Sequence, residues 1–261
     1  MLRDDQLERY SRQIILPEVG ADGQERLLGA RVLIVGLGGL GSAAAIYLAA
    51  AGVGTLGLID DGSVELSNLQ RQIIHGTGDV GRPKPRSAAD RIAAVNPEIT
   101  IETHLEKFTP ENGLSIVGSY DIAVDGSDNY PTRYAVSDAA SMANKPLVHA
   151  SALAFEGHVT IFPAGGRPCY RCLYPEPPPP GTVPTCQEAG IIGSLAGTLG
   201  AIQATEAVKL ILSVGEPLVC RLWTYDSRTA IVRILEYQPN PACPRCGDEP
   251  TITRPASRTA R

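Results

Sequence analysis

The stretch VGLGGLGS, residues 35–42, decides the fold of this chain of 261 residues. An apolar run typical of a buried strand, residues 30–36, leads into it, and a helix pattern over residues 38–52 follows. Its glycines in G-x-G-x-x-G spacing are Gly36, Gly38 and Gly41. This spacing permits a tight turn and brings backbone N–H groups at a helix N-terminus close to a phosphate.

A second strand pattern, residues 53–60, ends on Asp60, nineteen residues after Gly41. A carboxylate at this position can accept hydrogen bonds from ribose hydroxyls. The glycine turn and the acid together predict a nucleotide site. Two alternatives stay open at this point: an ordinary NAD site, and a glycine-rich turn required only for packing of the helix.

Helix and strand patterns alternate up to about residue 150. Helices are predicted over residues 86–97 and 130–145, and strands over residues 99–108, 120–128 and 146–152. Such alternation is typical of a mostly parallel sheet with helices on both faces. The sequence therefore predicts an α/β fold.

The pattern changes after residue 150. Strand patterns over residues 157–165, 220–226 and 229–237 surround a glycine-rich helix pattern over residues 190–214. We therefore expect antiparallel or mixed strands to extend the sheet. The expected organisation is a single domain over residues 1–247, with halves at 1–150 and 151–247, and a disordered tail over residues 248–261.

Charge and composition narrow the class of protein. The net charge of −5 and the isoelectric point of about 5.4 argue against a partner that is a nucleic acid or an anionic membrane. The N-terminal ten residues lack the apolar core of a signal peptide, which predicts a cytoplasmic location. The most apolar segment carries Gln203, Glu206 and Lys209, so we expect a buried helix there and not a membrane span.

Polar and charged side chains follow the second predicted strand. They are Asn68, Gln70, Arg71 and Lys84. A dehydrogenase needs only the acid at this edge of the sheet, whereas an enzyme that neutralises a triphosphate and its leaving pyrophosphate needs such cations. The set favours a nucleoside triphosphate, although each charge taken alone is also compatible with a solvated surface.

Four of the six cysteines form two C-x-x-C pairs, Cys169/Cys172 and Cys243/Cys246. Four thiolates can hold one zinc ion in a tetrahedron. Seventy residues separate the pairs, more than in a zinc ribbon, so a redox dithiol and free thiols stay open as alternatives.

The two other cysteines differ in their surroundings. Cys186 follows the run EPPPPGTVP, residues 176–184, which contains too much proline for a packed strand or helix. We therefore expect Cys186 on an exposed loop where its thiol is available for chemistry. Cys220 opens a predicted buried strand and is expected in the core.

Eight motifs between Arg9 and Gly247 are together similar, in order and spacing, to the MoeB/ThiF/HesA family, bacterial relatives of the ubiquitin-activating enzymes. They are RYSRQIIL, VLIVGLGGLGS, LIDDGSVELSNLQRQ, GRPKPRSA, DGSDN, CYRC, TCQEAG and CPRC. The resemblance implies a Rossmann-like fold and a homodimer. It also implies adenylation of the C-terminal Gly-Gly carboxylate of a small ubiquitin-like sulfur-carrier protein, with ATP and magnesium.

The resemblance also implies roles for single residues. Gly39 and its loop would lie against the ATP phosphates, and Asp60 would hold the ribose. Asn68, Arg71 and Lys84 would contact the triphosphate.

The DGSDN motif, with Ser127 where the family usually has threonine, would supply the magnesium-associated carboxylate, Asp128, and a further nucleotide contact, Asn129. A cap of the helix near Tyr130 is the alternative role for Asp128. Arg12 would reach across a dimer interface into the ATP site of the neighbouring copy.

For the cysteines, the resemblance implies a structural zinc site formed by the two pairs, away from the ATP. Cys186 would lie on a loop where some relatives form a covalent intermediate and others do not. Some relatives carry a C-terminal rhodanese domain that this sequence lacks, so we expect a separate sulfur donor.

Three other functions are weighed against this one. An NAD-dependent oxidoreductase would need a nicotinamide-binding half, which the sequence does not indicate. A silent scaffold for a ubiquitin-like partner would be expected to have lost Arg12, Arg71, Lys84 and Asp128. A relative that adenylates a modified tRNA base is disfavoured by the acidic charge and the double cysteine motif.

Overall fold

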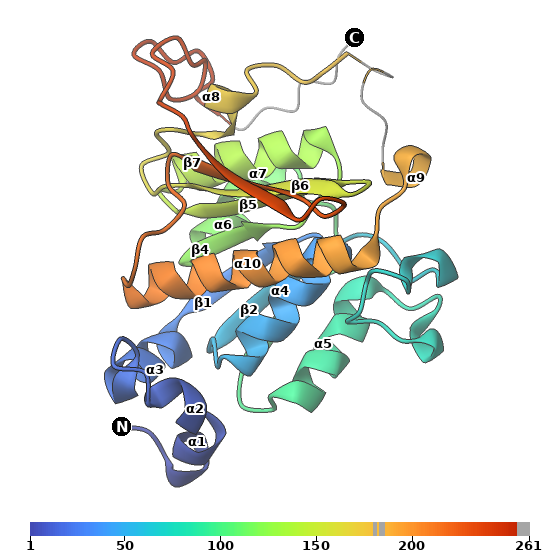
Figure 1. Ribbon diagram of the computed structural model, residues 1–261, viewed down its shortest axis with the longest axis vertical. Coiled ribbons are helices and arrows are strands. Elements are labelled where there is room, and N and C mark those ends of the chain that lie inside the picture. Colours follow the sequence, from blue (N-terminus) through green and yellow to red (C-terminus); the bar gives the residue numbers. More distant parts are fainter. Residues whose placement is uncertain (180–181, 183–185, 255–261) are drawn as a thin grey trace.

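The computed structural model describes residues 1–179, 182 and 186–254, and the described residues form one sheet of eight strands in the order β3-β2-β1-β4-β5-β6-β7-β8 (Figure 1). The strands are β1 (Arg31–Val35), β2 (Thr55–Ile59), β3 (Thr100–His104), β4 (Ile122–Asp125), β5 (Leu147–Leu153), β6 (Glu156–Phe162), β7 (Arg221–Asp226) and β8 (Ile231–Glu236).

The sheet changes direction where the sequence pattern changes. Strands β1 to β5 pair in parallel, and β6, β7 and β8 continue the sheet by antiparallel pairing. A parallel strand needs a crossover helix, whereas β5 and β6 are joined by a tight turn at Ala154 and Phe155. The predicted mostly parallel sheet with antiparallel strands in its C-terminal half is confirmed.

The helices are α1 (Asp4–Arg9), α2 (Ser11–Ile14), α3 (Gly20–Gly29), α4 (Gly39–Ala50), α5 (Lys84–Val95), α6 (Pro110–Gly118), α7 (Tyr130–Met142), α8 (Tyr170–Leu173), α9 (Cys186–Ala189) and α10 (Gly193–Leu212), with short 3-10 helices η1 (Leu66–Asn68) and η2 (Thr77–Asp79). The structure confirms the predicted helices α4, α5, α7 and α10. Helices α1 to α3, α6, α8 and α9 were not predicted, and α9 begins at Cys186, which was expected on a loop.

Two apolar cores separate the three layers. Alternate residues of β1 face opposite ways, so Val32 and Ile34 pack with α4, α5 and α10, while Leu33 and Val35 pack with α6 and α7. Figure 1 shows α10 running beside α4 on one face of the sheet and α7 on the other. The three-layer α/β/α architecture is therefore confirmed.

Helix α10 alone among the described helices is long and apolar enough to cross a membrane. Half of its apolar window is buried inside the fold, where it packs on α4, β5 and β6. Gln203 within it is fully buried and donates to the carbonyl oxygens of Asp125 and Val148, at 2.8 and 3.1 Å. These contacts are those of a core helix.

Strand order reverses between β1 and β4, which places their carboxyl ends side by side. The amide of Gly126, directly after β4, donates to the carbonyl of Val35 at 2.8 Å. In open α/β sheets, ligands bind in the crevice at such a switch point. The glycine turn and the DGSDN motif therefore meet at one edge of the sheet.

Three features near the C-terminal half differ from expectation or lie outside the description. Cys220 is half-buried and precedes β7 with a φ of 58°, so its prediction as a core residue opening the strand is wrong. Hydrogen-bonded structure extends past Gly247, because the amides of Thr251 and Ile252 donate to the carbonyl of Pro244. The backbone of Cys186 begins α9, but its side chain lies outside the described part of the chain.

Candidate active site

The glycines of the turn between β1 and α4 have different structural roles. Gly36 has a φ of 87°, and a Cβ there would lie 3.0 Å from the Gly126 carbonyl oxygen. A Cβ at Gly41 would lie 1.9 Å from the carbonyl oxygen of Gly36, so Gly41 permits the close packing of helix and turn. At Gly38 the nearest atoms are 4.0 Å away, and this glycine lines an open cavity.

Asp60 lines the same cavity and also fixes its shape. Its Oδ2 accepts from the amide of Leu37 in the glycine turn at 2.8 Å, and its Oδ1 accepts from the amide of Gly62 at 2.8 Å. A Cβ built on Gly62 would lie 3.0 Å from Asp60 Oδ1 and 3.4 Å from Lys84 Nζ, so these two side chains flank Gly62.

The cavity has a volume of about 280 Å³ and lies at the switch point of the sheet. The predicted site residues that line it are Gly36, Gly38, Gly39, Asp60, Arg71, Lys84, Asp128 and Asn129. Arg71 and Lys84 supply positive charge opposite the carboxylates of Asp60 and Asp128. Such a mixture suits a nucleotide with phosphate groups and a cation.

Four predicted site residues do not line this cavity. Gly41 is committed to packing, and the Asn68 side chain accepts from the amide of Glu65 at 3.1 Å, which fixes the turn before Arg71. Gln70 is exposed, although its carbonyl packs on Gly193 of α10. Arg12 is exposed on α2, and its reach into a neighbouring copy stays a prediction.

The DGSDN loop is held by a buried carboxylate. Asp125 Oδ1 accepts from the amide and the hydroxyl of Ser127, at 3.0 and 2.6 Å, and its Oδ2 accepts from His149 Nδ1 at 2.8 Å. Asn129 caps α7 by accepting from the amide of Thr132 at 3.0 Å. The capping role considered for Asp128 is therefore wrong, and the Asp128 carboxylate faces the cavity.

Two histidines lie near this loop, His149, which is buried, and His158, which is half-buried. Burial lowers the pKa of His149, against the opposing effect of Asp125, and burial lowers the pKa of His158 to about 3. Burial by itself would raise the pKa of Asp125, but hydrogen bonds from His149 and Ser127 hold it below its ordinary value. Both histidines are thus neutral near pH 7 and Asp125 is ionised.

Sequence reasoning missed two cations of the site. Lys107 follows β3 at the same edge of the sheet, and Arg133 lies one helical turn after Asn129 on α7. Their positions in the sequence could have revealed them. Lys107 follows the carboxyl end of a parallel strand, and Arg133 lies four residues after the site residue Asn129 on a helix. Without knowledge of tertiary contacts, a charged residue in a predicted helix is expected to be exposed to solvent.

A second cavity, of about 570 Å³, adjoins the first. The two share Asp128, Asn129, Arg133 and Ala152 as lining residues. The rest of the second cavity is formed by the start of α7 and by β5, β6, β7 and β8, including His158 on its β6 wall. The two cavities therefore share one wall.

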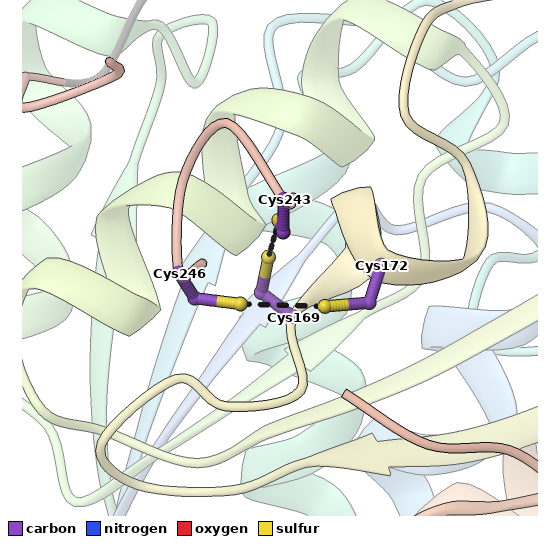
Figure 2. A group of neighbouring side chains, drawn as sticks. All are labelled: Cys169, Cys172, Cys243 and Cys246. Atoms are coloured by element: carbon purple, nitrogen blue, oxygen red, sulfur yellow. Dashed lines mark hydrogen bonds between the residues drawn. The ribbon is translucent and has the colours of Figure 1, made fainter. Parts of the chain in front are cut away.

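The four paired cysteines converge at one point although their pairs are distant in sequence (Figure 2). Their sulfur atoms all lie within 4.8 Å of one another, with 3.6 Å between Cys169 and Cys243 and 3.3 Å between Cys172 and Cys246. A tetrahedral zinc with Zn–S of about 2.3 Å has S···S edges of about 3.8 Å, so the cluster fits that ion.

Neighbouring groups favour a thiolate at Cys172. Hydrogen bonds from Cys169 and Cys246 lower its pKa, and its Sγ accepts from the amide of Asn240 at 3.5 Å. The segment from Cys169 to Cys172 is held against α7, because Arg171 within it makes a buried bidentate ion pair with Asp138 of α7, at 3.0 and 2.9 Å.

A phosphate-binding turn that opens onto a second cavity, at the switch point of a Rossmann-like sheet, defines an enzyme that joins a nucleotide to another molecule. The model of the ThiF family matches residues 10–245. The chain therefore belongs to the ThiF family, as the sequence motifs predicted.

Individual relatives agree with this assignment. The sulfur carrier protein adenylyltransferase of Thermus thermophilus is 49% identical over 252 residues, covering 95% of this chain and 93% of that protein. The SAMP-activating enzyme E1 of Haloferax volcanii is 50% identical over 243 residues, covering 93% and 90%. Among solved structures, E. coli MccB with ATP superimposes with a TM-score of 0.75 at 25% identity, covering 92% of this chain and 74% of that one.

Gly41→Ala and Gly38→Ala should separate packing from nucleotide binding. Because its Cβ would overlap the Gly36 carbonyl, Gly41→Ala should lower the free energy of unfolding by about 3 kcal/mol. Gly38→Ala should keep wild-type stability but weaken nucleotide binding by about tenfold, since its methyl group enters the cavity. Urea unfolding and titration with a non-hydrolysable ATP analogue measure both effects. Equal stability of the two variants would contradict this division.

His158→Gln should reduce the acid sensitivity of the fold. The folded-state pKa of about 3 lies below the unfolded value of about 6.5, so only the unfolded chain takes up this proton between those values. Stability is therefore lost as the pH falls below about 6.5. From pH 7.5 to pH 5, the wild type should lose about 2 kcal/mol more than the variant in urea unfolding. Parallel pH profiles for the two proteins would show that His158 does not titrate in this way.

Proposed function

We propose that this protein adenylates the C-terminal Gly-Gly carboxylate of a small ubiquitin-like sulfur-carrier protein, releasing pyrophosphate and preparing the carrier for thiocarboxylate formation. The observation that carries the proposal is the shared wall of the two cavities at Asp128, Asn129, Arg133 and Ala152. Relatives named sulfur carrier protein adenylyltransferase and SAMP-activating enzyme E1 support this substrate class.

The reaction needs positioning and charge more than proton transfer. A carboxylate oxygen of the carrier attacks the α-phosphorus of ATP, a C–O–P bond forms, and the bond to pyrophosphate breaks with its electron pair on the leaving group. No proton moves, so a general base is unnecessary. Arg71, Lys84 and Lys107 line the cavity where the phosphates and the leaving charge would lie.

Magnesium fits the same place. Asp128 has an exposed carboxylate that lines both cavities, and among the described residues it accepts one long side-chain hydrogen bond, from Asn129 at 3.5 Å. Hard cations prefer such carboxylate oxygens together with substrate phosphates. When bound, the ion would neutralise phosphate charge beside Arg71 and Lys84.

The cysteine cluster is proposed to hold structural zinc. Its sulfur spacing fits a tetrahedron, and the buried Arg171–Asp138 pair connects it to α7, whose first residues line the site. Zinc would thereby fasten the segment after β8 to the helix that carries Arg133. It would lie outside both cavities and take no part in adenylation.

Several finer points belong to the same proposal. We infer a cytoplasmic homodimer in which Arg12 enters the ATP site of the neighbouring copy, and a separate protein that donates sulfur. Cys186 would act, if at all, after adenylation, because attack on ATP needs no thiol. Exposure of Arg12 on α2 is compatible with an intersubunit role.

ATP–pyrophosphate exchange with a purified carrier protein ending in Gly-Gly tests the proposal. The wild type should exchange only when the carrier is present, and Lys84→Gln or Asp128→Asn should lower the rate by at least about 100-fold through lost charge stabilisation. Arg91→Gln, at an exposed position on α5 that lines neither cavity, is the matched surface control. Cys186→Ser should keep exchange even where sulfur transfer is lost.

Carrier-independent exchange, or tight NAD binding without exchange, would contradict the proposed reaction. Exchange supported equally by a carrier lacking its last glycine would contradict the substrate assignment.

Metal analysis tests the zinc proposal. The purified protein should contain about one zinc per chain, and Cys243→Ala should lose the metal and unfold at lower temperature. Cys220→Ala removes a half-buried thiol outside the cluster and should keep the zinc. Wild-type zinc content in Cys243→Ala would exclude this cluster as the site.

A further inference from the structure

Arg133 is a buried cation placed where the two cavities meet. It lies on α7, has 8% of its surface exposed, and lines both cavities. Asn129, one turn earlier, caps the helix, and the cap fixes the position of Arg133 relative to the cavities. Its side chain is therefore held by the fold at the one wall that the nucleotide site and the second site share.

The guanidinium group of Arg133 has few hydrogen-bond partners within the described part of the protein. Nη2 donates to the Ser127 carbonyl at 3.4 Å, a long hydrogen bond, and the group lies 5.4 Å from the centre of the Tyr130 ring. Nε is buried without a hydrogen-bond partner. Within the part of the chain that the structure describes, Arg133 forms no ion pair.

Arg171 provides the internal comparison. It is equally buried, at 3% exposure, and it lies above the Tyr134 ring much as Arg133 lies above Tyr130. Unlike Arg133, it donates two hydrogen bonds to the buried carboxylate of Asp138. Burying a charge is costly unless it is paired. The fold therefore pairs Arg171 with an internal carboxylate and leaves Arg133 available to pair with the anion of a ligand.

Two anions reach this wall in the proposed reaction: the ATP phosphates and the carboxylate of the acceptor. The nucleotide cavity already contains Arg71, Lys84 and Lys107. In the second cavity the only buried cation among the described lining residues is Arg133. Arg233 on the same wall is exposed, and the acids Glu156 and Asp226 are both paired with Arg228. A carboxylate entering this cavity is therefore attracted to the unpaired Arg133.

We propose that Arg133 binds the terminal carboxylate of the acceptor and holds it against the α-phosphate, an inference that rests on the proposed function. The planar guanidinium group can hold one carboxylate oxygen through Nε–H and Nη–H donors while the other oxygen attacks. It also offsets repulsion between two anions that must come within bonding distance. Once the acyl adenylate forms, the carboxylate charge is gone and this attraction weakens.

The test uses the full-length protein, a non-hydrolysable ATP analogue, and a carrier in two forms that end in Gly-Gly carboxylate or Gly-Gly amide. The wild type should bind the carboxylate form about 100-fold more tightly than the amide. Arg133→Gln should bind both forms with equal, weak affinity, and Arg133→Lys should recover part of the preference. Arg133→Gln should weaken binding of the ATP analogue less than Lys84→Gln does, because Arg133 lies at the edge that the nucleotide cavity shares with the second one.

Two controls separate this role from a structural one. Arg133→Gln should melt closer to the wild type than Arg171→Gln does, because Arg133 makes no hydrogen bond to a buried carboxylate and only attracts Asp125 at longer range, whereas Arg171 donates two hydrogen bonds to Asp138. Lys84→Gln should weaken the ATP analogue and keep the preference for carboxylate over amide.

The outcomes are distinguishable. Full carboxylate preference in Arg133→Gln, or a loss of ATP-analogue affinity in it as large as that in Lys84→Gln, overturns the role of Arg133, while the proposed function stands if the wild type still exchanges pyrophosphate. Absence of exchange by the wild type with the carrier overturns the proposed function, and the role of Arg133 falls with it.

Discussion

The close contact between two loops at the carboxyl ends of β1 and β4 is the constraint on which the site depends. Gly36, Gly41 and Gly126 approach so closely that a Cβ on any of them would lie 3.0 Å or less from a backbone atom of this contact. Because the loops touch, the start of α4 and the start of α7 lie at the same place. The first places Gly38 and Gly39 at the cavity, and the second places Asp128, Asn129 and Arg133 there.

The buried charged groups near this contact differ in whether they have a partner. Asp125 is fully buried but receives three hydrogen bonds, and Arg171 and Asp138 satisfy each other. Arg133 is comparably buried and lacks such a partner among the described residues. A fold that satisfies its structural charges and leaves one cation unpaired at a cavity wall is prepared for an anionic ligand. The two cavities and this arginine thus form one functional unit.

Much of this arrangement could be predicted from the sequence because it depends on local rules. The turn from β1 to α4, the acid after β2 and the parallel half of the sheet follow from glycine spacing and alternating patterns. Helix α3 was missed because it begins and ends with glycine, and α6 because it is short and contains two glycines and a proline. Arg133 and Lys107 were missed because burial and shared cavity walls arise from tertiary contacts that no local pattern contains.

The DGSDN motif shows where the resemblance helped and where geometry was needed. The motif pointed to Asp128 as a functional carboxylate, but the cap of α7 could have been either Asp128 or its neighbour. The structure assigns the cap to Asn129 and leaves Asp128 facing the cavity. The cysteine pairs gave a similar lesson, because only the fold brings sulfur atoms from both ends of the second half within 4.8 Å.

The central claim is that the nucleotide and the acceptor carboxylate meet at the wall shared by the two cavities. Intact mass of a carrier protein ending in Gly-Gly, after incubation with this protein, ATP and magnesium, tests that claim most directly. The account predicts a carrier whose mass has increased by one adenylyl group, with pyrophosphate released in equal amount. A carrier of unchanged mass, or one that has gained a phosphoryl group with release of ADP, would contradict it.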